Sequence, residues 1–128
     1  MNKIFGIGTD IVDISRIKSV FNKNKKFKSR IFSVKEIKHC ASRTDKMAFY
    51  AKRFAAKEAF VKALGTGIRN DISFNEISIN NNKSGAPFIE LLGKTKAITK
   101  KLIKKKNKIY LSLSDEKKYA LAMVVISN

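Results

Sequence analysis

Acidic residues, cysteine and histidine are scarce in this chain. Its 128 residues hold ten Asp and Glu against 28 Lys and Arg, with one Cys, one His, one Pro and no Trp. A single cysteine cannot form an internal disulfide, which fits a reducing compartment, so we expect a cytoplasmic protein. One Cys and one His also cannot supply a closed set of zinc ligands. No apolar run approaches membrane-spanning length and no secretory signal pattern is present, so we expect no membrane partner.

The excess of basic residues gives a formal net charge of +18 at pH 7. Such a field steers polyanions, so a basic nucleic-acid-binding module is one hypothesis for the chain. The densest lysine run, over residues 99–108, has no aromatic residues interleaved with it, and base stacking therefore lacks a platform. We interpret this run as a solvated face and expect no nucleic acid as a partner.

The core-forming residues are sufficient for one domain over residues 1–128, because hydrophobic types make up 44% of the chain and include nine Phe. Residues 33–36 form a capping box, Thr44 can cap a long helix, Gly65 can end it, and residues 22–29 form a basic connector. This order predicts an α+β fold, with helices packed on one side of a mainly antiparallel sheet. Strands are predicted over residues 4–12, 74–79, 87–92, 109–113 and 119–126, and helices with their caps over 13–22, 33–42, 44–64 and 95–106.

Two acidic residues stand out among the basic ones. Asp10 shares a strand face with Gly6 and Gly8, where the missing side chains leave room for a ligand, or else it caps the following helix. Glu58 lies on or near the apolar stripe of the long helix, where an ion pair with Lys62 is the structural alternative. Two carboxylates beside glycines and cations indicate a divalent cation with phosphate bound to it. Basic residues of the same helix would then neutralise phosphate charge: Arg53, Lys57 and Lys62.

Two motifs carry a resemblance to a known family. The segments GIGTDIVDISRI, residues 6–17, and RFAAKEAFVKALGTGI, residues 53–68, resemble the signature segments of the bacterial holo-[acyl-carrier-protein] synthases, the short type of 4′-phosphopantetheinyl transferase. Both match without gaps and in the right order, and a weaker likeness extends over the full chain. The resemblance implies transfer of 4′-phosphopantetheine from coenzyme A to a serine of apo acyl carrier protein, for fatty acid biosynthesis, with release of adenosine 3′,5′-bisphosphate.

The resemblance also implies roles for single residues. Asp10 and Glu58 are the ligands of Mg²⁺, and Glu58 and Lys62 are the catalytic residues. In-line attack at phosphorus builds charge on the leaving phosphate, which a metal and cationic side chains stabilise. Contacts with coenzyme A fall on the long helix and the loop after it: Arg53, Lys57, Lys62, Gly65, Thr66 and Gly67.

Two kinds of protein partner follow from the same resemblance. The acyl carrier protein is small and strongly acidic, and the family's basic docking helix corresponds to the stretch after the first strand. Arg16, Lys23 and Lys26 are the candidate contacts there, which would steer the encounter and fix its register. The resemblance also implies a homotrimer with active sites between subunits. We therefore expect the two carboxylates to share a site with loops of a neighbouring subunit.

Two positions depart from the family pattern. Many members have a histidine in the final turn, where this chain has Asp115, and some have another where it has Tyr110. A histidine base is therefore not assigned. The serine proton has three candidate acceptors: Glu58, a metal-bound water, or a water held by another carboxylate. A chain that kept only carrier binding, without transfer, is the remaining alternative.

Overall fold

A computed structural model describes residues 3–67, 71–103 and 106–127 of the chain. The fold is α+β with antiparallel sheets, as the sequence predicted. The elements in chain order are β1 (Ile4–Asp13), α1 (Ile14–Lys23), α2 (Phe27–Ile31), α3 (Val34–Ala41), α4 (Lys46–Leu64), the 3-10 helix η1 (Phe74–Glu76), β2 (Ile77–Asn81), β3 (Pro87–Leu91), α5 (Gly93–Leu102), β4 (Lys108–Asp115) and β5 (Tyr119–Ser127).

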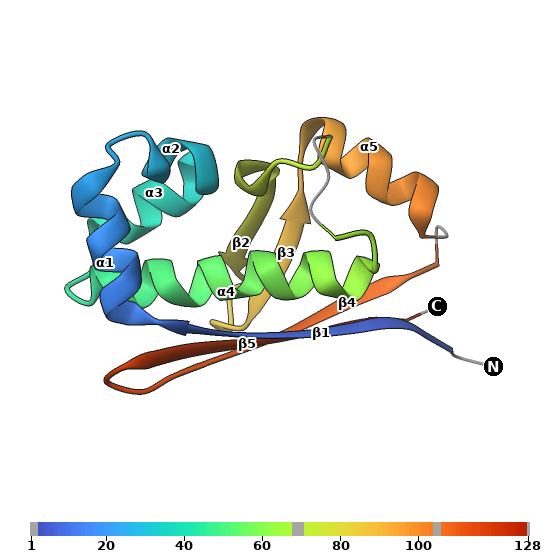
Figure 1. Cartoon of the computed structure of the whole chain (residues 1–128). Coiled ribbons are helices and arrows are strands. Elements are labelled where there is room, and N and C mark those ends of the chain that lie inside the picture. The colour runs from blue at the N-terminus through green and yellow to red at the C-terminus, as the bar shows by residue number, and fades with distance from the viewer. Residues whose placement is uncertain (1–2, 68–70, 104–105, 128) are drawn as a thin grey trace.

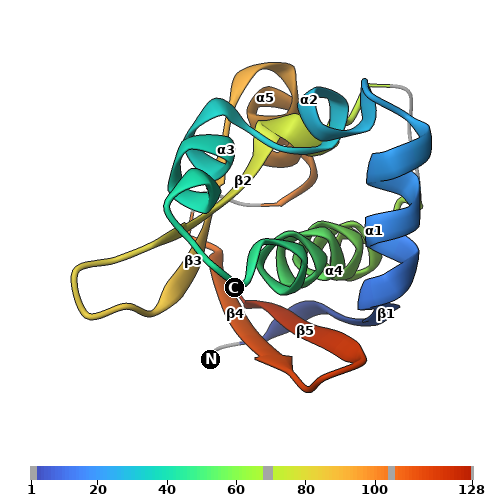
Figure 2. The same cartoon turned by 90° about the vertical axis from the view of Figure 1, so that its left-hand side faces the viewer.

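Helix α4 is the central element of the fold (Figure 1). It lies along one face of a three-stranded sheet with the strand order β1–β5–β4, and both neighbouring pairs of strands are antiparallel. The first three helices gather around the N-terminal half of α4, while the β2–β3 hairpin and α5 stand above it (Figures 1 and 2). No helix of the described part of the chain covers the opposite face of the three-stranded sheet, so that face is exposed (Figure 2).

Gly6 and Gly8 bring β1 into close contact with α4. A Cβ atom built on Gly6 would lie 1.9 Å from the carbonyl oxygen of Ala63, and one built on Gly8 would lie 1.9 Å from that of Ala59. The helix backbone therefore occupies the space beside these glycines. The prediction that their missing side chains leave room for a ligand is wrong, because they make room for α4 instead.

Replacing Gly8 with alanine should destabilise the fold by about 3 kcal/mol, the upper end of the usual cost of overpacking a core. The added methyl group would meet backbone rather than a side chain that can rotate away. Urea unfolding followed by circular dichroism measures the loss. Thr9→Ala, at the exposed neighbouring position, is the matched control and should cost only a few tenths of a kcal/mol. Equal stability of the two variants would contradict the packing argument.

The connector predicted over residues 22–29 is wrong in its second half, because α2 begins at Phe27. The ring of Phe27 packs against Phe21, Phe32 and Phe54, with centroid separations of 5.4, 6.2 and 6.1 Å. This aromatic cluster joins α1, α2 and α4. Packing of these rings stabilises the short helix α2, which the lysine-rich sequence did not predict.

Two predicted helix signals are confirmed and one is wrong. The capping box over residues 33–36 opens α3, and Gly65 ends α4 in the left-handed region with φ 76°. Helix α4 starts after Asp45, not after Thr44, and Asp45 makes no side-chain cap hydrogen bond. Its carboxylate accepts hydrogen bonds of 2.7 and 2.8 Å from the guanidinium of Arg43, so it is turned away from the helix end.

The strand predicted over residues 74–79 is wrong at its start. Its first three residues form the 3-10 helix η1, and the strand begins at Ile77. The backbone carbonyls of Phe74 and Ile77 both accept hydrogen bonds from the ammonium of Lys57. A turn that aims two carbonyls at one buried cation is incompatible with extended backbone over the whole segment.

The lysine-rich helix α5 begins two residues earlier than predicted and ends at Leu102, because Ile103 is already extended with φ −120° and ψ 145°. Residues 104 and 105 of the predicted helix lie outside the described residues. In the part of the chain that the structure describes, no helix is long and apolar enough to cross a membrane.

Candidate active site

Asp10 and Glu58 lie together at one pocket, although 48 residues of sequence separate them. Asp10 comes from β1 and Glu58 from α4, and the glycine contacts described above hold these two elements close. The pocket has a volume of about 360 Å³ and is also lined by Arg16. The fold therefore brings together the two carboxylates that the sequence paired.

Lys62 completes this group from the next turn of α4. Its ammonium donates a hydrogen bond of 2.9 Å to the carbonyl oxygen of Thr9 and one of 3.3 Å to Oδ1 of Asp10. The alternative in which Lys62 pairs with Glu58 is wrong for this structure, because the carboxylate that it contacts is that of Asp10. Among the described residues, no hydrogen bond or ion pair involves the side chain of Glu58.

The Glu58 carboxyl is half-buried and lies near a second negative charge. Burial raises its pKa, the charge of Asp10 raises it further, and the charge of Lys62 opposes both effects. A carboxyl with a raised pKa is a better proton acceptor than an ordinary surface glutamate. The same repulsion between two carboxylates favours a cation placed between them.

The two carboxylates of this pocket suit Mg²⁺, although they are too few to surround a metal ion with protein ligands alone. Within residues 3–67, 71–103 and 106–127, no group of three or more His, Cys, Asp or Glu side chains could hold a metal. Mg²⁺ typically uses one or two carboxylates and completes its shell with water and phosphate oxygens. Asp10 and Glu58 supply those carboxylates, and the lysine ammonium on Asp10 shows that a cation can stand there.

The loop after α4 is open to an approaching ligand. Gly65 and Gly67 both have positive φ, at 76° and 66°, and a Cβ atom built on either would meet no described atom within 4 Å. Between them, Thr66 donates its hydroxyl to the carbonyl oxygen of Gly67 at 3.1 Å. The loop starts three residues after Lys62 and therefore lies next to the cationic C-terminal end of α4.

Lys57 is placed differently from the other predicted phosphate contacts. Its side chain is fully buried, and its ammonium lies 2.7 Å from Oε1 of Glu36. It also donates to the two carbonyls at the start of β2. The prediction that Lys57 contacts coenzyme A is incompatible with this burial, because Lys57 instead joins α4 to α3 and to β2. Burial lowers its pKa, and the charge of Glu36 opposes that shift.

Arg53 lies in a separate cationic pocket on another face of α4. Its guanidinium stacks 3.5 Å from the ring centroid of Phe49 and donates a 2.7 Å hydrogen bond to Oδ1 of Asn81. Burial lowers its pKa to about 10. Among the described atoms its buried Nε has no hydrogen-bond partner. Arg43 and Lys52 line the same pocket of about 200 Å³, so three cations face one small space.

Asp115, the residue at the position of the family histidine, lies beside this cationic pocket. Its Oδ1 is 3.3 Å from the ammonium of Lys52. The sequence did not indicate this contact, because the two residues lie on α4 and at the end of β4, far apart in the chain. Asp115 therefore acts in this structure as the partner of a lysine.

The predicted docking residues are all exposed. Arg16 and Lys23 are seven residues apart in α1 and therefore lie on the same face of that helix, while Lys26 lies in the turn before α2. Arg16 also lines the pocket of the two carboxylates. The basic face of α1 thus borders the candidate metal site.

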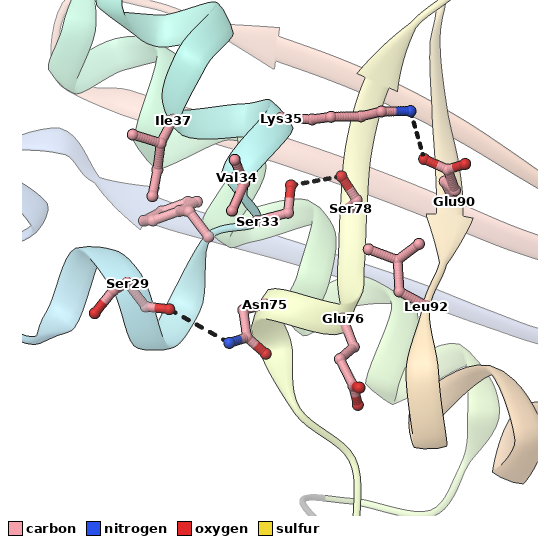
Figure 3. A pocket seen from close by; sticks show the side chains of 11 residues that line it. Ser29, Ser33, Val34, Lys35, Ile37, Asn75, Glu76, Ser78, Glu90 and Leu92 are labelled. Atoms are coloured by element: carbon pink, nitrogen blue, oxygen red, sulfur yellow. Dashed lines mark hydrogen bonds and ion pairs between the residues drawn. The ribbon is translucent and has the colours of Figure 1, made fainter.

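A further pocket, of about 500 Å³, lies between α3 and the β2–β3 hairpin (Figure 3). Its polar groups bind one another: Lys35 pairs with Glu90 at 3.3 Å, and the hydroxyls of Ser33 and Ser78 are 2.6 Å apart. None of the predicted site residues lines it. We assign the chemistry to the smaller pocket of Asp10 and Glu58.

Comparison with known proteins places this chain in a family. A sequence profile described as the 4′-phosphopantetheinyl transferase superfamily matches residues 6–124. The chain is 50% identical over 128 residues to the holo-[acyl-carrier-protein] synthase of Zymomonas mobilis, with 96% of each chain covered. The holo-[acyl-carrier-protein] synthase structure from Neisseria meningitidis matches with a TM-score of 0.86 and 39% identity, covering 97% of this chain and 98% of that one.

A Helicobacter pylori holo-[acyl-carrier-protein] synthase, solved in complex with coenzyme A, matches with a TM-score of 0.76. It is 36% identical, and the match covers 94% of this chain and 98% of that one. The two motifs, the fold and nearly the whole length of the sequence therefore agree. The chain belongs to the 4′-phosphopantetheinyl transferase superfamily.

Proposed function

We propose that this protein transfers 4′-phosphopantetheine from coenzyme A to a serine hydroxyl of apo acyl carrier protein, with release of adenosine 3′,5′-bisphosphate. The observation that carries the proposal is the convergence of Asp10 and Glu58 at one pocket, with the ammonium of Lys62 paired to Asp10. The curated relative from Zymomonas mobilis and the solved relatives bear the name of this activity, and one of them holds coenzyme A. Residues 1–128 act as one domain, in the cytoplasm and for fatty acid biosynthesis.

Asp10 and Glu58 would hold Mg²⁺ in this reaction. When bound, the ion neutralises charge that develops on the transferring and leaving phosphate groups. Lys62 brings a further positive charge to the same place, and the open loop of Gly65, Thr66 and Gly67 lets phosphate come close to the helix end. The serine proton keeps three candidate acceptors: Glu58, a metal-bound water, or a water held by another carboxylate.

The pocket of Arg53 suits a second phosphate of coenzyme A. Residues five apart in an α-helix point about 140° away from each other, so Arg53 and Glu58 face different sides of α4. One bound coenzyme A cannot easily reach both sides of the same helix. We therefore assign the Arg53 pocket of one subunit and the carboxylates of another to one composite site.

The exposed face of the three-stranded sheet supports such an assembly. Alternate side chains of β1 and β5 point away from α4, and among them Ile7 and Ile11 are 61% and 62% exposed. Leu121 lies directly across from Ile11 in the strand register and is 43% exposed. A continuous apolar face of this kind is typical of a subunit interface. We assign it to a homotrimer.

Replacing Leu121 with lysine should disrupt the trimer, because three new charges would be buried together at the sheet face. Light scattering should give the wild type three times the 14.4 kDa of one chain, and the variant mostly the single-chain mass. Transfer should fall with the loss of the trimer. Val34→Lys is the matched control, since Val34 is 68% exposed on α3, away from this face. A monomeric wild type would contradict the assembly.

The basic face of α1 is assigned to the acidic carrier. Arg16 and Lys23 lie on it and Lys26 follows it, so a carrier bound there is delivered beside the Asp10–Glu58 pocket. Contacts between exposed charges are screened by salt, and they act mainly on the rate of encounter.

Intact-mass spectrometry tests the function directly. Purified protein, apo acyl carrier protein, coenzyme A and Mg²⁺ should give a carrier that is heavier by one 4′-phosphopantetheine group. A carrier whose modified serine is replaced by alanine should stay unmodified. Binding of several apo carriers without any mass increase would overturn the proposal and favour a protein that binds the carrier alone.

A further inference from the structure

The Lys62 ammonium contacts Asp10, one of the two proposed metal ligands. It contacts Oδ1 of Asp10 at 3.3 Å and the carbonyl oxygen of Thr9 at 2.9 Å. Carboxylate and carbonyl oxygens are also the ligands that hard divalent cations prefer. A lysine ammonium and a divalent cation compete for the same oxygen atoms.

The ion pair between Lys62 and Asp10 can be broken at low cost. The side chain of Lys62 is 56% exposed, while that of Asp10 is 18% exposed. Ion pairs with one exposed partner are worth little in water, and lysine carries a flexible four-carbon stem. Asp10 is therefore the fixed member of the pair, and Lys62 is the member that moves.

The other groups at the pocket do not take this place. Arg16 lines the same pocket, but within the described residues no ion pair joins it to a carboxylate. The carboxylate of Glu58 likewise has no ion-pair partner in the described part of the chain. One carboxylate thus has its own internal cation, and the other does not.

We propose that Lys62 is an exchangeable internal counter-ion: it neutralises Asp10 in the empty site, and an arriving divalent cation displaces it. The displaced ammonium is then free to bind a phosphate group that enters with the metal. The inference rests on the proposed function for the assignment of Asp10 and Glu58 as metal ligands. It adds that metal binding and phosphate binding are coupled through one side chain, and such coupling is reciprocal.

Binding of Mn²⁺ to the protein without coenzyme A tests the exchange. Free Mn²⁺ is counted by its electron paramagnetic resonance signal during titration of the wild type and of Lys62→Met and Arg16→Met. Lys62→Met should bind Mn²⁺ about fivefold more tightly, as expected from removal of a surface ion pair worth about 1 kcal/mol. Arg16→Met removes an equal charge from the same pocket and should change the affinity less than about twofold. If both variants gained Mn²⁺ affinity equally, the gain would come from the lower positive charge alone, and the proposed exchange would be overturned.

Lysine side-chain NMR follows the displaced group itself. In protein labelled at lysine Cε, the signal lost in Lys62→Met is that of Lys62, and Mg²⁺ should move it in the wild type. In Asp10→Asn the ion pair is weakened and one proposed metal ligand is lost, so Mg²⁺ should leave the signal in place. A wild-type signal that does not respond to Mg²⁺ would overturn the inference even if transfer activity is normal. Failure of transfer with a responsive signal would overturn the proposed function alone.

Discussion

Replacing Asp10 with asparagine or Glu58 with glutamine should lower the rate of transfer by about 10²–10³, the usual cost of removing a group that stabilises transition-state charge. Both changes keep the size of the side chain and remove a negative charge from the pocket that the two residues line. In the proposed site both carboxylates are needed to hold the ion, so neither variant should be rescued by the remaining carboxylate. Initial rates of carrier modification at saturating Mg²⁺ measure the loss.

Asp13→Asn is the matched control for these variants. Asp13 lines the same pocket, but its carboxylate accepts a 2.9 Å hydrogen bond from the backbone of Ser15 and caps α1. Asparagine caps helices as well as aspartate does, so the fold and the transfer rate should be kept. If Asp10→Asn retains a third or more of the wild-type rate while Asp13→Asn is unchanged, Asp10 is not a metal ligand.

Thermal unfolding separates loss of chemistry from loss of fold. Asp10→Asn loses an exposed ion pair with Lys62, which costs at most about 1 kcal/mol. Glu58→Gln removes a half-buried charge beside another carboxylate, so its stability should stay the same or rise. Both variants should therefore transfer slowly while remaining folded, and Glu58→Gln should be at least as stable as the wild type.

Local signals were enough to single out the two carboxylates and to predict the ends of some elements. The end of α4 at Gly65 follows from a residue that tolerates positive φ, and the start of α3 follows from a four-residue box. Glu58 stood out because an acid interrupts an apolar stripe. Each of these features depends on residues within about one helical turn of each other, so it can be predicted from the sequence.

Contacts between distant segments could not be predicted in the same way. Gly6 and Gly8 are explained by the carbonyl oxygens of α4, more than fifty residues away. The partner of Lys62 proved to be Asp10 rather than its helix neighbour Glu58, because the closeness of β1 outweighs the spacing along the helix. Spacing within one helix names the candidates for a contact, but the packing of a second element selects among them.

Lys57 shows both the limit and a signal that was available. It lies three residues after Phe54 and four before Val61, on the same apolar stripe as Glu58. A lysine at the centre of that stripe requires a buried acid, and Glu36 of the capping box is that acid. The position of Lys57 could have indicated a buried ion pair, whereas the identity of its partner depends on how α3 packs against α4.

Replacing Lys57 with methionine should lower the free energy of unfolding by about 3–5 kcal/mol, the usual cost of breaking a buried ion pair. The variant leaves the fully buried Glu36 without its cation, and Oε2 of that residue has no partner in the described part of the chain even before the change. The carbonyls of Phe74 and Ile77 lose their donor as well. Urea unfolding measures the difference.

Two further variants show that the cost comes from the uncompensated charge. Lys35→Met breaks an exposed pair with Glu90, whose side chains are 71% and 38% exposed, and should cost less than about 1 kcal/mol. Lys57→Met combined with Glu36→Gln removes both charges, and the new side-chain amide would still accept a hydrogen bond from the backbone of Ser33, as the carboxylate does in the capping box. The double variant should therefore be more stable than Lys57→Met alone. If the second substitution instead adds to the loss, packing of the lysine stem rather than its charge holds α3, α4 and β2 together.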